Sequence, residues 1–80
     1  MEVQIIATHE CRHRLDLERE LLDLGIPFDL VFVEDNADLV HRYQIRHSPN
    51  LVIDGVVVFR GQPTEGQLRD LFTKLPKNGP

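Results

Sequence analysis

A single cysteine, Cys11, stands in a short run of charged residues near the start of the chain. Arg12 and Arg14 add fixed positive charge beside it, and His9 and His13 add more below neutral pH. Cationic neighbours and a helix N-terminus both stabilise a thiolate, which is the nucleophilic form of cysteine. Most free cysteines are small buried apolar residues, but charged surroundings disfavour burial. We therefore expect an exposed, reactive thiol at Cys11.

The elements that position Cys11 are a strand before it and a helix after it. Residues 3–7 form a short β-branched apolar run, which is typical of a buried strand. From about residue 12 to residue 24 leucines recur at roughly helical spacing, and Gly25 provides a stop for the helix. Cys11 is therefore predicted at the junction of the two elements.

A second strand and a short helix are predicted next. Residues 28–33 are aromatic and β-branched, which suits a strand. Asp35 or Asn36 is then placed to cap a short helix, whose apolar residues are Leu39, Val40 and Tyr43. Ser48-Pro49 lies beyond this helix, and proline does not continue a helix.

The last third of the chain predicts a hairpin and a third helix. Asp54-Gly55 separates the β-branched runs 51–53 and 56–59, a strong signal for a tight hairpin. Thr64 and Gln67 have the spacing of a capping box. They open a helix whose apolar stripe is Leu68, Leu71, Phe72 and Leu75.

The predicted fold class is α/β, in the order β-α-β-α-β-β-α, with one four-stranded mixed sheet flanked by helices. A helical crossover makes the first two strands parallel, and the hairpin makes the last two antiparallel. We expect one domain over residues 1–76, followed by a disordered tail at 77–80.

The size, charge and cysteine count of the chain argue against several classes of protein. With 80 residues and 41% hydrophobic side chains, the chain has material for one core. The net charge of −4 argues against nucleic acid, and one cysteine excludes an intrachain disulfide. No apolar run reaches the ~20 residues that span a bilayer, and no signal peptide is visible. We expect a cytoplasmic protein that uses neither membrane nor nucleic acid.

The element order, Cys11 at the first strand–helix junction and Ser48-Pro49 before the hairpin together resemble the thioredoxin/glutaredoxin superfamily. The likeness extends from residue 3 to about residue 75, and the hairpin at 53–58 followed by Gly61 also matches. The resemblance implies a thioredoxin-like fold with a cis-proline at Pro49 facing Cys11. It also implies that Ser48 offers backbone groups to a bound peptide or to glutathione.

The chain departs from that family at the second cysteine. Where the family has Cys-x-x-Cys, this sequence reads Cys11-Arg12-His13-Arg14. Thr8 stands where glutaredoxins tend to have lysine, and residues 61–64 lack their Gly-Gly-x-Asp pattern, which weakens the expectation of a glutathione pocket. Arg14 still suits a substrate carboxylate, because guanidinium binds carboxylates in a bidentate manner.

The leading expectation is a glutaredoxin-like redox protein that works through one cysteine, a monothiol thiol-disulfide oxidoreductase. Its site residues are Cys11 as nucleophile and, for substrate or glutathione binding, Arg12, Arg14, His47, Ser48 and Pro49. Protein disulfides or glutathione are the expected partners, with glutathione as a co-substrate and no bound cofactor. We expect a monomer or weak dimer.

Three alternatives stay open. A thioredoxin fold that has lost its second cysteine is suited to be a redox-inactive module that binds a protein or a metal. His9, Cys11, His13 and His47 offer nitrogen and sulfur ligands for zinc or copper, although we expect no metal site. The amino-terminal half of a glutathione-transferase-like protein has the same element order, but the helical second domain of such enzymes is not in this sequence.

Overall fold

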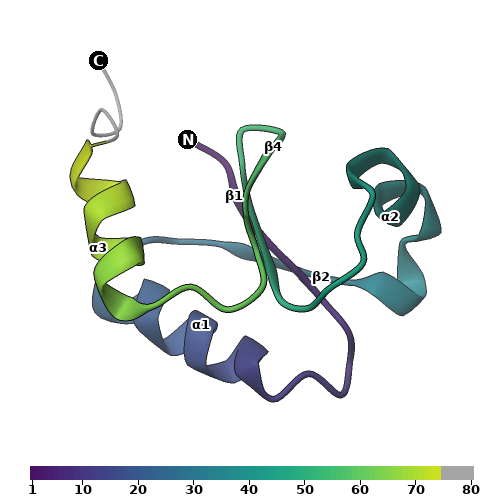
Figure 1. The fold of residues 1–80 in the computed structure, drawn as a ribbon, viewed down its shortest axis with the longest axis horizontal. Coiled ribbons are helices and arrows are strands. Elements are labelled where there is room, and N and C mark those ends of the chain that lie inside the picture. The colour runs from purple at the N-terminus through teal and green to yellow at the C-terminus, as the bar shows by residue number, and fades with distance from the viewer. Residues whose placement is uncertain (75–80) are drawn as a thin grey trace.

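The helices and strands follow the predicted order, β-α-β-α-β-β-α. The computed structural model describes residues 1–74. Its elements are β1 (Val3–Ala7), α1 (His13–Asp23), β2 (Asp29–Phe32), the 3₁₀ helix η1 (Val33–Asp35), α2 (Ala37–Tyr43), β3 (Asn50–Ile53), β4 (Val56–Arg60) and α3 (Glu65–Lys74) (Figure 1). The prediction missed η1, which takes Val33 out of the expected second strand. The Asn36 N–H donates to the Val33 carbonyl at 3.2 Å and closes this turn.

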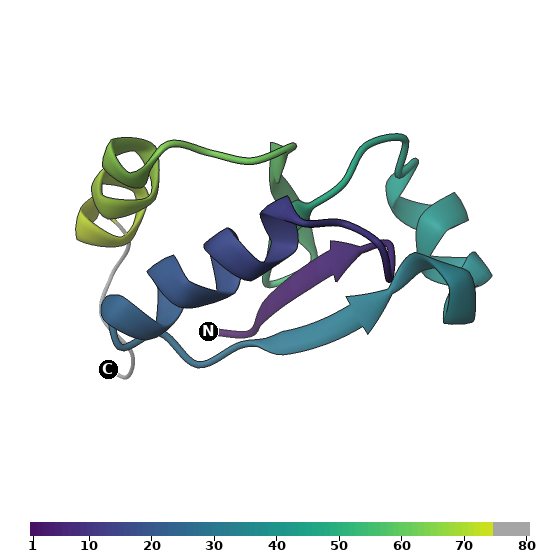
Figure 2. The same cartoon turned by 90° about the horizontal axis from the view of Figure 1, so that it is seen from below.

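The four strands form one mixed sheet in the order β2-β1-β3-β4. β1 and β2 are parallel, as a crossover through α1 requires, and Figure 2 shows their arrows pointing the same way. β3 is antiparallel to both β1 and β4. β1 is therefore a central strand, and the loop that carries Cys11 starts from the middle of the sheet.

A two-residue turn joins β3 to β4, as the sequence predicts. Asp54 and Gly55 both have positive φ, 50° and 82°, which is the backbone of a type I′ hairpin turn. Asp54 also ties the turn to the start of the chain. Its Oδ1 accepts a hydrogen bond from the Glu2 N–H at 2.7 Å, and its own N–H donates to the Glu2 carbonyl at 2.8 Å.

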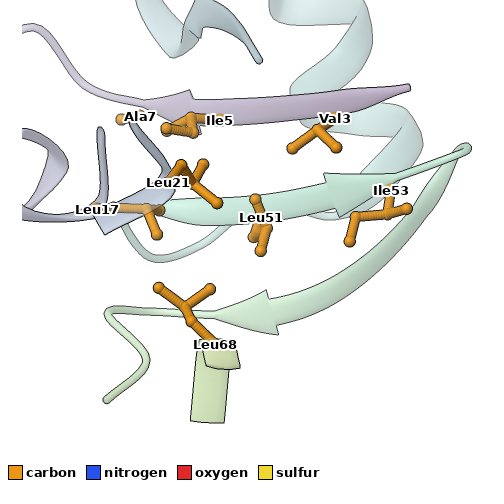
Figure 3. Close-up of a cluster of buried hydrophobic side chains, with 8 residues drawn as sticks. All are labelled: Val3, Ile5, Ala7, Leu17, Leu21, Leu51, Ile53 and Leu68. Atoms are coloured by element: carbon orange, nitrogen blue, oxygen red, sulfur yellow. The ribbon is translucent and has the colours of Figure 1, made fainter. Parts of the chain in front are cut away.

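The hydrophobic core lies between one face of the sheet and the helices α1 and α3 (Figure 3). Alternate residues of β1 contribute to it, because successive strand side chains point to opposite faces. On α1, Leu17 and Leu21 are fully buried, whereas Leu15 and Leu22 are 56% and 67% exposed. The buried cluster consists of Val3, Ile5, Ala7, Leu17, Leu21, Leu51, Ile53 and Leu68.

The short helix α2 has a side-chain partner at its carboxyl end but no side-chain cap at its amino end. Asn36 occupies the N-cap position, but its side chain makes no capping hydrogen bond. Its Nδ2 donates instead to the Phe32 carbonyl at 2.9 Å, so the predicted side-chain cap does not form. At the other end, Arg60 Nη1 donates to the carbonyls of Tyr43 and Gln44 at 2.9 and 3.2 Å. The last residue of β4 thus satisfies the carboxyl end of α2.

The predicted capping box opens α3. The Thr64 N–H donates to Gln67 Oε1 at 2.8 Å, and the Gln67 N–H donates to Thr64 Oγ1 at 3.1 Å. Leu75 and the expected boundary between residues 1–76 and a tail at 77–80 lie outside the described residues. Among residues 1–74, no helix is long and apolar enough to cross a membrane.

Candidate functional site

Cys11 lies in the loop that leads from β1 to α1. It directly precedes Arg12, the N-cap residue of α1, and its N–H donates to the Thr8 carbonyl at 3.2 Å. Its side chain is half-buried and packs against the edge of the hydrophobic core. The thiol is thus less exposed than the charged sequence around it suggests, because the loop turns the side chain towards the core.

The loop between α2 and β3 lies next to the Cys11 loop. The Ser48–Pro49 peptide bond is cis, and Ser48 Oγ accepts a hydrogen bond from the Thr8 N–H at 3.1 Å. The Pro49 carbonyl accepts from the Gly61 N–H at 2.8 Å. Both views of the fold place the two loops at the same end of the sheet (Figures 1 and 2). Segments 40 residues apart in sequence therefore meet at Thr8 and Ser48.

Asn50 is a further residue of this region that the sequence analysis missed. Its side chain is fully buried, and its Nδ2 donates to the Ile6 carbonyl at 3.1 Å and to the His47 carbonyl at 2.6 Å. The amide therefore links the end of β1 to the start of the Ser48–Pro49 loop. A polar residue at the start of an otherwise apolar strand was the available signal.

The ring of Phe32, the last residue of β2, organises two of the charged residues near Cys11. His9 stacks on it with ring centroids 3.9 Å apart, and the Arg14 guanidinium lies 5.3 Å from the ring centroid. Arg14 Nη1 also donates to Glu18 Oε2 at 2.8 Å, an ion pair along α1. Arg14 is therefore engaged with both Glu18 and Phe32.

Acidic residues of η1 hold the backbone before Cys11. Both carboxylate oxygens of Glu34 accept from the His9 N–H, at 3.2 and 3.0 Å. This hydrogen bond, and after it one from the backbone N–H of Glu34 itself, lowers the pKa of the Glu34 carboxyl, although desolvation acts in the opposite direction. His9 Nε2 lies 3.2 Å from Asp35 Oδ2. The Cys11 loop is thus fastened to η1 on one side and to Ser48 on the other.

The remaining site candidates, except Pro49, lie at the surface. Arg12 and His13, at the start of α1, are exposed, and so is His47 before Ser48, whereas Pro49 is buried. His9 faces Phe32 and Asp35, as described above. Within residues 1–74, no group of three or more histidine, cysteine or acidic side chains is arranged to hold a metal ion.

A mixed β2-β1-β3-β4 sheet, a cysteine before the first helix and a cis-proline loop beside it define a thioredoxin-like domain. Comparison with protein families agrees: the thioredoxin domain profile, Thioredoxin_3, matches residues 1–73. The chain belongs to this family.

Solved structures show the same fold. The crystal structure of the thioredoxin-like protein BC3987 superposes with a TM-score of 0.72 at 22% identity, covering 88% of this chain and 99% of that one. That protein's T8A mutant gives a TM-score of 0.72 at 23% identity, over 89% of this chain and 99% of the other. No curated protein matches this chain.

Proposed function

We propose that this chain is a monothiol thiol-disulfide oxidoreductase whose nucleophile is Cys11. The observation that carries the proposal is the pair of hydrogen bonds that joins Cys11 to Thr8 and Thr8 to Ser48. They hold the only sulfur nucleophile of the chain beside the Ser48–Pro49 loop, at the start of a helix. Unpaired N–H groups at a helix start favour the thiolate over the thiol.

In the first step the Cys11 thiolate attacks one sulfur of a substrate disulfide. A bond forms between Cys11 Sγ and that sulfur, the substrate S–S bond breaks, and the other substrate sulfur leaves as a thiolate. Arg14 replaces a second thiol, so this chain does not resolve the mixed disulfide itself. An external thiol such as glutathione then attacks it, forms a new disulfide with the substrate sulfur and releases the Cys11 thiolate. Protein disulfides and glutathione disulfides are the proposed substrates.

The neighbouring residues have distinct proposed roles. Arg12, exposed at the N-cap of α1, contributes positive charge that favours the thiolate. His47, Ser48 and Pro49 contact the substrate next to the reacting sulfur, because their loop borders the Cys11 loop. To bind a substrate carboxylate, Arg14 must first break its ion pair with Glu18.

Mass spectrometry of the intact chain after exposure to oxidised glutathione tests the proposal. We expect one glutathione per chain, removed again by reduced glutathione, and none on a Cys11→Ser variant. Alkylation near neutral pH supplies a second readout. The folded chain should react with iodoacetamide about tenfold faster than the same chain in urea, because folding brings Cys11 to the start of α1. Arg12→Gln should reduce that difference.

The opposite result identifies the alternative. If the folded thiol reacts no faster than the unfolded one and forms no glutathione adduct, Cys11 is not activated. The protein is then better described as a redox-inactive thioredoxin-fold module for a protein or metal partner.

A further inference from the structure

His9 stands in the turn that leads from β1 to Cys11. The Cys11 N–H donates to the Thr8 carbonyl at 3.2 Å, so residues 8–11 form a turn with His9 and Glu10 at its two central positions. A contact that fixes His9 therefore also fixes the direction in which the chain enters Cys11. The mechanism proposed above gives His9 no role.

Three contacts tie His9 to the end of β2 and to η1. Its backbone N–H donates to both carboxylate oxygens of Glu34, at 3.2 and 3.0 Å. Its ring stacks on Phe32 with centroids 3.9 Å apart and planes 16° apart. Its Nε2 lies 3.2 Å from Asp35 Oδ2. The turn before Cys11 is thus anchored to a distant segment of the chain through one residue.

One of these contacts changes its nature with pH. An imidazole ordinarily gains or loses its charge between pH 5 and pH 8. When the His9 ring is protonated, its contact with Asp35 is an ion pair, and when the ring is neutral the contact is a hydrogen bond without a net charge on the ring. The two side chains are 49% and 66% exposed, so the charge strengthens the contact only modestly.

The charges around the His9 ring favour its protonated form in this contact. Glu34 and Asp35, both on η1, face it with carboxylates. The opposing charge is the guanidinium of Arg14 on α1, which lies 5.3 Å from the centroid of the aromatic ring on which His9 stacks. Arg14 is already paired with Glu18 at 2.8 Å, which offsets its repulsion.

We propose that His9 is a positioning residue of Cys11 and that its protonation tightens the turn before the thiol. The inference rests on the function proposed above and adds a regulation by pH to the same site. The tightened turn holds Cys11 more firmly at the start of α1, where backbone N–H groups favour the thiolate. Cys11 therefore keeps more of its reactivity in mildly acidic solution than it has without the contact to Asp35.

Asp35→Asn tests the proposal, because it removes the charge of the anchor and keeps a hydrogen-bond acceptor. The measurement is the rate of alkylation of Cys11 by iodoacetamide at pH 6 and at pH 8. The variant should react about twofold more slowly than the native chain at pH 6 and equally fast at pH 8. Loss of a carboxylate that acted only through space would favour the thiolate and speed the reaction. Slowing confined to pH 6 is therefore the sign of positioning, and equal or faster reaction at pH 6 would overturn it.

A double-mutant cycle shows whether the two side chains act through one contact. His9→Gln should slow the reaction at pH 6 at least as much as Asp35→Asn, because the stacking on Phe32 is lost as well. The double variant should be no slower than His9→Gln alone, since both changes remove the same ion pair. Additive slowing would refute the shared contact.

The matched control is Asp38→Asn, which removes the same charge from an exposed position in the first turn of α2. Asp38 is three residues beyond Asp35, and it should not slow the reaction at either pH because it is not the partner of the His9 ring. Equal slowing by the two asparagine variants would mean that net charge, and not the anchor, sets the rate.

Hydrogen exchange reads the anchor without any thiol chemistry. In the ¹⁵N-labelled Cys11→Ser chain, the amides of residues 9 and 11 should exchange about twofold more slowly at pH 6 than in the same chain with Asp35→Asn. At pH 8 the two chains should exchange equally. Identical exchange at pH 6 would overturn the role of His9. An unreactive Cys11 together with the expected exchange would instead refute the proposed function and leave His9 as the anchor of the turn.

Discussion

Two side chains that do no chemistry hold Cys11 in its setting. The Glu34 carboxylate accepts a hydrogen bond from the backbone N–H of His9. The Asn50 side chain donates hydrogen bonds that join the end of β1 to the cis-proline loop. Both contacts link segments distant in sequence, and both involve main-chain atoms of the loops around the thiol. Loss of either one changes loop position rather than the reactive group itself.

Asn50→Asp is predicted to lower the free energy of unfolding by about 2 kcal/mol or more. A buried carboxylate does not donate to the Ile6 and His47 carbonyls, so both acceptors lose their partner. Urea unfolding followed by circular dichroism measures the change. Asn36→Asp is the control with the same shape change. Because Asn36 is less buried and loses only one hydrogen bond, that to the Phe32 carbonyl, its cost should be smaller, about 1 kcal/mol.

Glu34 gives the protein a specific acid sensitivity. The His9 N–H, and after it the Glu34 N–H, lower the pKa of this carboxyl in the folded state. Such a group stabilises the fold above the pKa that it has when unfolded. The stabilisation is lost as pH falls through the lower, folded-state pKa.

The Tm of the native chain should therefore exceed that of a Glu34→Gln variant at pH 6. The gap should close in strong acid, below the usual carboxyl pKa of about 4.3. Thermal unfolding at several pH values measures it. A gap of constant size over this range would show that the Glu34 charge does not hold the loop.

At the scale of elements, α1 and α3 cover one face of the sheet. The negative charges of Glu20 on α1 and Glu65 on α3 repel each other. Glu20 on α1 has one carboxylate oxygen, Oε2, that is buried and lacks a hydrogen-bond partner among the described residues. Burial in the first place, and then the negative charge of Glu65 on α3, raises the pKa of Glu20. Asp16 and Asp23 on α1 add to the shift.

Glu20→Gln should therefore stabilise the protein at pH 7, by a few degrees in Tm. A carboxyl with a raised folded-state pKa opposes folding when ionised, so the gain should vanish near pH 3.5, where Glu20 is protonated in both states. Glu18→Gln on the same helix is the comparison. It removes the ion pair with Arg14 and should give no gain at pH 7. Equal gains from both variants would mean that only net charge matters.

In the molecule as a whole, one cluster of buried side chains joins β1, β3, α1 and α3, and partly buried residues of β2 and β4 pack against it. Leu68 is the buried residue of α3, and it packs with residues of α1, β1 and β3 (Figure 3). An 80-residue domain has a total stability of only about 5–10 kcal/mol. Truncation in this cluster therefore removes a large share of it.

Leu68→Ala should lower the free energy of unfolding by about 2–5 kcal/mol, because it removes buried methyl groups and leaves a cavity. Leu22→Ala makes the same chemical change at a residue that is 67% exposed, and it should cost less than about 0.5 kcal/mol. Chemical denaturation of the two variants side by side gives the comparison. Similar costs at both positions would contradict the role of Leu68 in this cluster.

What the sequence alone determined is the local architecture of this protein. The Asp54-Gly55 turn and the Thr64–Gln67 capping box depend on residues only a few positions apart, so their chemistry is readable from spacing. The order of elements, and with it the thioredoxin-like fold, follows from the same local patterns. Local patterns do not always give the right contact: the Asn36 side chain donates to the Phe32 carbonyl instead of capping α2.

The groups that surround Cys11 come together through long-range packing, which brings distant segments side by side. Phe32 holds His9 and Arg14, and Asn50 anchors the cis-proline loop to β1. Arg60 reaches the carboxyl end of α2 only because β4 ends beside that helix. These contacts join residues far apart in the chain, and their existence depends on strand order and packing, which local spacing does not encode.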